Sequence, residues 1–331
     1  MSKEKEFSVK RYPGNPHLRH NSCAGASSAM SRRGAQPYDI GHSQNFLHSR
    51  GLVTSLMART NISSNDTIIE IGPGKGIITE GLANICKHLI AVEYDRTLAQ
   101  KLKDRFAGNS RIQIVEHDFL KYSMPASGEY KICANIPFNL TADIMKKVLE
   151  CNNRPDEIYF IMQYEAFLKY AGQPFYADSL RSLLYKPFFS AELLHEFQPT
   201  DFHPVPKSRI CFVRFHKKIP SDISDEAQYR NFIAYVFSAP GNGFKEKTKK
   251  IFSNEQQKRL CKQLNINMAS RLADITYEGW LYIYNVFLRF VPADKKGLII
   301  NAERDLKISQ SKIQKMHRNR NQGCRKFCKR C

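Results

Sequence analysis

The feature that most constrains the fold is a glycine-rich turn between an apolar run and an amphipathic run. Residues 67–71, Thr-Ile-Ile-Glu-Ile, predict a buried strand, and residues 77–83 predict a helix. Between them the turn reads Glu70-Ile-Gly72-Pro-Gly74-Lys-Gly76. Glycines at a strand-to-helix turn let a nucleotide-like ligand approach the backbone closely. The spacing is G-x-G-x-G, and taken alone these glycines fit a dinucleotide site equally well.

Strands and helices continue to alternate after this turn. Apolar runs predict strands over 89–93, 112–115, 130–134 and 157–162, then near Leu193 and over 210–215, with helices over 96–106 and 142–149. This alternation predicts an α/β fold with a mostly parallel, doubly wound sheet and right-handed crossovers. After residue 215, helical periods over 225–237, 254–264 and 277–290 predict a small C-terminal helical domain.

Length and composition allow two domains and give no membrane signal. The chain has 331 residues, of which 42% are hydrophobic, enough for a sizeable core. No run of 18 apolar residues occurs, and the N-terminal Lys3-Glu4-Lys5-Glu6 has no apolar stretch behind it. We therefore expect neither a membrane span nor a secretory signal, and we predict a soluble, cytoplasmic protein.

The net charge of +20 is concentrated at the two ends of the chain. Residues 1–37 hold seven Lys/Arg against two acidic residues, and residues 301–331 hold ten against two. Residues 1–37 lack an apolar period and are interpreted as a disordered basic arm. Basic arms on a milder body favour contact with a polyanion backbone, the alternative being a merely basic soluble protein.

Nine cysteines are scattered along the chain, an odd number. Residues such as Cys133 and Cys211 lie in apolar runs, which indicates buried thiols in a reducing compartment. Cys324, Cys328 and Cys331 at the end of the chain suggest a metal site, but a second pair of ligands is missing. We predict no metal and interpret residues 301–331 as a loose, basic, cysteine-bearing tail.

Acidic residues end the second and third predicted strands. Glu93 follows Gly76 by 17 positions, and its carboxylate can accept hydrogen bonds from both hydroxyls of a ribose. Asp118 is placed to accept from an adenine amino group. Each acid taken singly fits a solvated turn residue. At successive strand ends, where open α/β sheets bind ligands, the set predicts a site for an adenosine-containing molecule.

The fourth predicted strand ends in Asn135-Ile136-Pro137-Phe138. An adenine amine is a poor nucleophile because its lone pair is delocalised into the ring. The side-chain amide of Asn135 and the carbonyl of Ile136 can accept its two protons and favour a pyramidal nitrogen. Pro137 stiffens the turn, and Phe138 offers a flat face for stacking an extruded base. In isolation the same residues also describe a plain proline turn with a core Phe.

Together these motifs resemble the Erm rRNA adenine N6-methyltransferases, which share their fold with the KsgA small-subunit rRNA dimethyltransferases. The landmarks run in the family's order from about residue 40 to 215. They are Ser43-Gln44-Asn45-Phe46-Leu47, Glu70 to Gly76, Val92-Glu93, Asp118, Asn135 to Phe138, and Phe202-His203-Pro204-Val205-Pro206-Lys207. KsgA-like proteins usually have Gly before the Gln-Asn-Phe and Leu-Pro-Tyr in the catalytic turn, so Ser43, Ile136 and Phe138 favour Erm.

The resemblance implies S-adenosyl-L-methionine as cofactor and gives roles to matching residues. It implies cofactor contacts for Asn45, Leu47, Gly72, Glu93, Asp118 and Asn135. Asn135 and Phe138 would be catalytic, with Phe138 replacing the Tyr of many relatives. Phe138 and Phe202 would flank the target base, and the alternative for Phe202 is a core Phe before a Pro-rich turn.

The resemblance also implies a domain plan and a function. We predict a Rossmann-like class I methyltransferase domain over 38–215 and a helical RNA-binding domain over 216–300. The expected reaction is methylation of an adenine N6 amine in 23S rRNA, naked or precursor, at the peptidyl-transferase loop. It would confer macrolide, lincosamide and streptogramin B resistance. A KsgA-like 16S rRNA dimethyltransferase is the first alternative, and a non-catalytic nucleic-acid-binding factor the second. We expect a monomer.

Overall fold

The computed structural model describes residues 45–312. The arm predicted over 1–37, residues 313–331 of the tail and the three terminal cysteines lie outside the described residues. Seven strands form the main sheet. In spatial order they are β4 (Ile112–Glu116), β3 (His88–Glu93), β2 (Thr67–Ile71), β5 (Lys131–Asn135), β6 (Glu157–Gln163), β9 (Ile210–Lys217) and β7 (Phe189–Glu196). The strands from β4 to β6 pair in parallel, and β9 is antiparallel to both its neighbours. The predicted mostly parallel sheet is confirmed.

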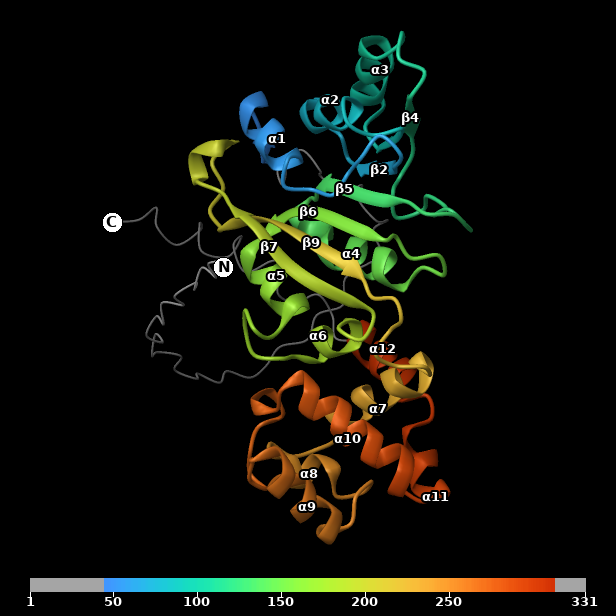
Figure 1. Cartoon of the computed structure of the whole chain (residues 1–331), viewed down its shortest axis with the longest axis vertical. Helices are drawn as coiled ribbons and strands as arrows, with labels where there is room; N and C mark the ends of the chain where they lie inside the picture. Colours follow the sequence, from blue (N-terminus) through green and yellow to red (C-terminus); the bar gives the residue numbers. More distant parts are fainter. Residues whose placement is uncertain (1–44, 313–331) are drawn as a thin grey trace, which may run out of the picture. The chain divides into compact units, whose positions relative to one another are not determined.

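The sheet is covered on both faces, and its central strands are correspondingly apolar. β6 is buried along its length except at its last residue. Because successive side chains alternate between faces, neighbouring residues of one strand enter different clusters. Cys133 and Tyr159 pack on the side of α1 (Arg50–Met57) and α2 (Ile77–Ala83). Ile132 and Phe160 pack on the side of α4 (Thr141–Glu150) and α5 (Tyr164–Ala171) (Figure 1).

The helices after β9 form the predicted helical domain. They are α7 (Glu226–Ser238), α8 (Phe244–Thr248), α9 (Asn254–Leu264), α10 (Tyr277–Phe290), α11 (Ala293–Lys296) and α12 (Ala302–Lys312). The predicted bounds of α9 and α10 are confirmed. Trp280 and Phe287 of α10 belong to the same apolar cluster as Phe160 of the sheet. A continuous core therefore joins the helices to the sheet.

Six helices of the described residues were not predicted from the sequence. They are α1, α5, α6 (Leu180–Tyr185), α8, α11 and α12. The interpretation of the chain after residue 300 as a loose tail is wrong for 302–312, because these residues form α12 and pack against α7. α3 (Arg96–Arg105) ends within one residue of its prediction. A short second sheet pairs β1 (Phe46–Leu47) with β8 (Phe202–His203).

A buried arginine ties α7 and α12 to α4, which packs on the main sheet. Arg230 of α7 is 5% exposed and has Nη2 2.6 Å from carboxylate oxygens of both Glu150 and Glu303. Glu150 lies on α4 and Glu303 on α12, and Lys307 pairs with both carboxylates. This network replaces the apolar contact that α12 lacks, since none of its residues is buried.

We predict that Arg230→Met lowers the free energy of unfolding by about 1.5–3 kcal/mol, because it removes the charged hydrogen bonds to the half-buried carboxylates of Glu150 and Glu303, which keep only Lys307 as a cation. Urea unfolding of the full chain measures this. The matched control is Arg259→Met, which breaks an exposed pair with Glu255 and should change stability little. Equal losses in the two variants would contradict the assignment of Arg230 as the link between the two parts.

Candidate active site

Four loops that carry the predicted site meet at the carboxyl edge of the parallel strands. The turn after β2 is bonded to β3 because the Gly72 N–H donates to the Val92 carbonyl at 2.9 Å. The turn after β4 is bonded to β3 because the His117 N–H donates to the Glu93 carbonyl at 2.8 Å. The parallel register therefore brings together the glycine turn, the two acidic turns and the Asn135 turn.

The glycine turn needs its glycines for two separate reasons. Gly72 and Gly74 have φ of +62° and +57°, a backbone conformation that side chains rarely adopt. A Cβ on Gly74 would stand 2.9 Å from the ring of Phe46, so the glycine permits close packing of the residue 46 segment. At Gly72 nothing lies within 4 Å of a Cβ position, so its backbone faces open space that a ligand can enter.

The carboxylate of Glu93 holds the glycine turn in place. It is 4% exposed, and its Oε2 accepts the Gly74 N–H at 2.9 Å while its Oε1 accepts the Asp95 N–H at 2.9 Å. Burial raises the pKa of Glu93, and these backbone hydrogen bonds oppose that shift. Each carboxylate oxygen can accept a further hydrogen bond. The predicted contact of Glu93 with a ribose remains a prediction.

Asp118 lies in a turn whose backbone carbonyls are hydrogen-bonded by a lysine. Its Oδ1 accepts the Leu120 N–H at 2.9 Å. Lys147 of α4 donates from Nζ to the carbonyls of Leu120, at 3.0 Å, and Tyr122, and lies 5.4 Å from the centre of the Phe119 ring. Nothing in the sequence pattern marked Lys147, because its partners lie 25 and 27 residues away. The role of Asp118 toward an adenine remains a prediction.

The Asn135 turn begins at the last residue of β5. Asn135 donates from Nδ2 to the carbonyl of Asn45 at 2.7 Å. This bond orients the amide and leaves Oδ1 as the acceptor for an incoming amine. Pro137 is extended, with φ of −62° and ψ of 128°, and the half-buried Phe138 starts a single 3₁₀ turn. The turn therefore presents one acceptor and one aromatic ring from adjacent positions.

One pocket collects most of the residues predicted for the site. Its lining includes five of them: Asn45, Leu47, Gly72, Asn135 and Phe138. Glu93 is linked to this pocket through its bond to Gly74, whereas Asp118 and Phe202 do not line it. The open backbone at Gly72, the Glu93 carboxylate bonded to the same turn and the Asn135 amide are the kinds of group that bind an adenosine-containing cofactor with a charged amino-acid end.

Glu70 also lines this pocket, and the sequence analysis gave it no role. It is 1% exposed, and its Oε2 has no hydrogen-bond partner among the described residues. Burial, together with the neighbouring Glu93 carboxylate, raises the pKa of Glu70 to about 8, although hydrogen bonding from Thr79 lowers it. The signal that could have identified it is a charged residue inside an otherwise apolar strand.

Phe202 lies in the core instead of on an open face. It pairs with Leu47 across β1 and β8, is 2% exposed and packs edge-on against Phe197 with ring centres 5.0 Å apart. The alternative of a core Phe therefore describes its surroundings, and a contact with the target base remains a prediction. Phe202 also lines a larger neighbouring cavity.

The comparison with known families decides the class of the protein. A family described as ribosomal RNA adenine dimethylase matches residues 39–288. This chain belongs to that family. Its members use S-adenosyl-L-methionine, as the resemblance implied, and act as rRNA adenine methyltransferases. α12 lies beyond the matched residues.

This chain is similar to several curated relatives over nearly the whole length of each relative. An rRNA adenine N-6-methyltransferase of Bacteroides fragilis is 27% identical over 252 residues, 75% of this chain and 93% of the relative. One from Escherichia coli is 29% identical over 76% of this chain and 97% of the relative. The ribosomal RNA small subunit methyltransferase A of a Nostoc species is 28% identical over 73% of this chain and 95% of the relative.

Solved structures confirm the class I methyltransferase fold. The crystal structure of the 23S rRNA methyltransferase ErmE has a TM-score of 0.68 at 21% identity, covering 74% of this chain and 100% of that one. A dimethyladenosine transferase from Plasmodium falciparum has a TM-score of 0.59 at 20% identity, covering 76% and 98%. No helix within 45–312 is long and apolar enough to cross a membrane. In the same residues no group of His, Cys, Asp or Glu is arranged to hold a metal.

We predict that Glu70 makes the apo protein less stable as the pH rises. A carboxyl whose pKa is about 8 when folded, against 4.5 ordinarily, binds its proton more tightly in the folded state. The contribution of this group to stability is therefore fully present below about pH 4.5 and is lost as the pH rises through about 8. The free energy of unfolding falls by at most ~1.4 kcal/mol per pH unit for one proton.

Glu70→Gln keeps the shape of the side chain and removes this titration. Melting temperatures are measured between pH 5 and 8.5. The melting temperature should decrease less with rising pH in Glu70→Gln than in the wild type or in the exposed control Glu129→Gln. Parallel curves for all three proteins would show that Glu70 does not titrate in this range.

Proposed function

We propose that this protein methylates the N6 amine of one adenine in 23S rRNA, once or twice, and thereby confers resistance to macrolide, lincosamide and streptogramin B antibiotics. The observation that carries the proposal is the Asn135 turn. Its Nδ2 donates to the Asn45 carbonyl, which leaves Oδ1 as an acceptor in the pocket that Asn135 lines with Gly72 and Phe138.

The residues of the turn act by position and by aimed dipoles. When bound, S-adenosyl-L-methionine supplies a sulfonium methyl group that is already activated, so no general base is needed before attack. Asn135 Oδ1 and the carbonyl of Ile136 accept the two protons of the adenine amine and make its lone pair available. Phe138 stacks on the extruded base and fixes the position of the base relative to these acceptors. Catalysis rests on orientation and preorganised acceptors.

The residues of the cofactor side hold the adenosine and the amino-acid end. Glu93, fixed by the Gly74 and Asp95 N–H groups, accepts from the ribose hydroxyls through its free lone pairs. Asp118 accepts from the cofactor's adenine amino group, in a turn that Lys147 holds. Glu70, with an unpartnered Oε2 among the described residues, faces the same pocket. Asn45 and Leu47 close the pocket from the segment before α1.

Two features favour 23S over 16S rRNA as the target. The catalytic turn reads Asn135-Ile136-Pro137-Phe138, whereas KsgA-like proteins usually have Leu and Tyr at its second and fourth positions. The names of relatives similar to this chain are mostly rRNA adenine N-6-methyltransferase, although a small-subunit methyltransferase is equally similar. A 16S dimethyltransferase is therefore the competing target assignment. An intact turn argues against a factor that has lost catalysis.

The target prediction is that naked 23S rRNA, or a fragment of its peptidyl-transferase loop, accepts labelled methyl groups, while assembled 50S subunits and 16S rRNA accept few. Primer extension and mass spectrometry identify the modified base. Expression in a susceptible bacterium should raise the inhibitory concentration of erythromycin. Methylation confined to 16S rRNA, with unchanged susceptibility, would replace this proposal by the 16S alternative.

We predict that Asn135→Ala lowers the methyl-transfer rate at saturating substrates by at least ~10²-fold, a typical loss for one positioned dipole. Binding of S-adenosyl-L-methionine and RNA should change less than the rate, because the loss falls on the transition state. Phe138→Tyr should stay active because it keeps an aromatic face. Phe138→Ala should lose activity because it removes stacking on the base worth ~1–3 kcal/mol. A folded, RNA-binding Asn135→Ala that turns over at the wild-type rate would exclude this mechanism.

A further inference from the structure

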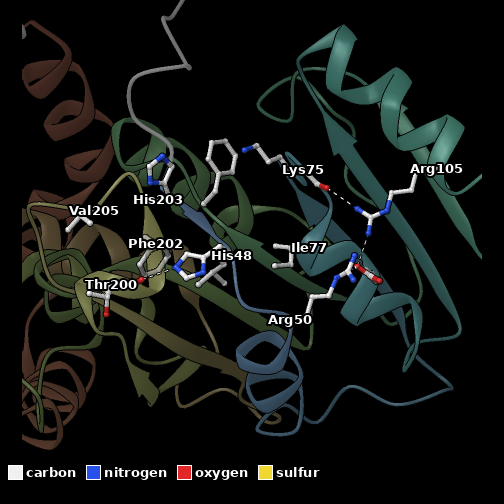
Figure 2. A pocket seen from close by; sticks show the side chains of 12 residues that line it. His48, Arg50, Lys75, Ile77, Arg105, Thr200, Phe202, His203 and Val205 are labelled. Atoms are coloured by element: carbon white, nitrogen blue, oxygen red, sulfur yellow. Dashed lines mark hydrogen bonds and ion pairs between the residues drawn. The ribbon is translucent and has the colours of Figure 1, made fainter.

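A second, larger cavity opens beside the candidate active site. Its volume is about 1020 Å³, and it shares the wall residues Phe46, Leu47, Lys75 and Ile77 with the pocket that holds Asn135 and Phe138. Its other side is formed by the β8 region, where Thr200, Phe202 and His203 lie (Figure 2). We call this space the entry cavity. None of the roles described above uses it.

The entry cavity carries more positive than negative charge. Arg50 from α1, Lys75 from the glycine turn and Arg105 from α3 line it, and Glu80 is the carboxylate of the lining. Three cations on three separate elements therefore face one acid. Among the described residues, no carboxylate lies within 4.0 Å of the Lys75 ammonium, which instead stands 5.3 Å from the centre of the Phe46 ring.

Glu80 holds both guanidinium groups in place. Its Oε2 is 3.3 Å from Arg50 Nε and 2.7 Å from Arg105 Nη2, so Arg50 and Arg105 converge (Figure 2). Arg105 also donates from Nη1 to the Lys75 carbonyl at 3.0 Å, which fixes it to the glycine turn. One carboxylate thus positions two cations without neutralising both, and each guanidinium retains donors for another anion.

We propose that the entry cavity binds the RNA phosphates that flank the target adenosine. This inference rests on the proposed function and adds the site where the RNA backbone is held during methylation. A base extruded into the Asn135 and Phe138 pocket remains attached to its own sugar and phosphates, so these must lie next to that pocket. The entry cavity adjoins it through shared walls, and its cations match the charge of phosphates. Arg50 and Lys75 are the phosphate ligands, and Glu80 preorganises Arg50.

The test compares two double variants with the same loss of charge. Arg50→Gln/Lys75→Gln removes two cavity cations. Lys87→Gln/Arg111→Gln removes two exposed cations that precede β3 and β4, at the opposite edge of the sheet. Affinity for a peptidyl-transferase loop fragment is measured against salt concentration. For single-stranded contacts, each lost phosphate should reduce the log–log slope by about 0.7, so only the cavity variant should fall by up to ~1.4.

A chemically altered RNA locates the contact. A methylphosphonate replaces, in turn, the phosphate on each side of the target adenosine and removes its charge. Wild type and the control variant should lose affinity for one of these RNAs, whereas the cavity variant should bind it and the natural RNA equally. Arg50→Gln alone repeats the measurement without touching a residue of the cofactor pocket, and calorimetry should show unchanged S-adenosyl-L-methionine affinity for it.

Glu80 supplies a change of opposite sign. Glu80→Gln removes the negative charge but keeps an amide oxygen that can accept from both guanidinium groups, so it should strengthen RNA binding and steepen the salt slope. Equal losses in the cavity and control variants, or equal effects of the methylphosphonates on wild type and the cavity variant, would overturn the inference. Neither result would contradict the proposed function. That proposal is contradicted separately if the wild type does not methylate 23S rRNA.

Discussion

The parallel pairing of β2 with β3 and β5 decides where every functional group lies, because it brings the ends of these strands to one edge. Ile71 pairs with Val92, and Asn135 pairs with Ile161 of β6 at the same end of the sheet. The acid that holds the glycine turn and the amide that we propose receives the target amine therefore come from strands separated only by β2. A shift of one residue in either pairing would turn Asn135 or Glu93 to the other face and separate them.

The same edge concentrates polar groups where the sheet is otherwise dry. Glu70 and Glu93 are almost completely buried, and burial raises the pKa of both. Glu93 is compensated by two backbone N–H groups, whereas Glu70 keeps an oxygen without a partner among the described residues. Such a group costs stability in the empty protein. A cofactor with a cationic end can remove that cost, so binding strength and the instability of the empty site have one origin.

Strong periodicity made most of the fold predictable, and contacts between distant residues account for the rest. The bounds of β2, α2, α9 and α10 were predicted because their apolar patterns are regular. α12 was missed because it has no buried residue and is held by an arginine 73 positions away. Asn135 and Phe138 were predicted from their motif. The burial of Phe202 and the clamp by Lys147 follow from long-range pairing that no local pattern contains.

The sequence of the Asn135 turn distinguishes subfamilies, but the groups that hold the cofactor do not by themselves select one adenine in an RNA. Relatives named for N-6 methylation of rRNA and a relative named for the small subunit are 27–29% identical to this chain over similar spans. Groups that hold the cofactor and shape the amine serve any adenine, since they contact atoms common to every target. Discrimination must come from surfaces that contact the RNA around the base. In the part of the chain described, the entry cavity adjoins the catalytic turn and carries cations on α1, the glycine turn and α3. In the binding mode that we propose, the spacing of those cations determines which RNA backbone geometry can place its adenine against Asn135.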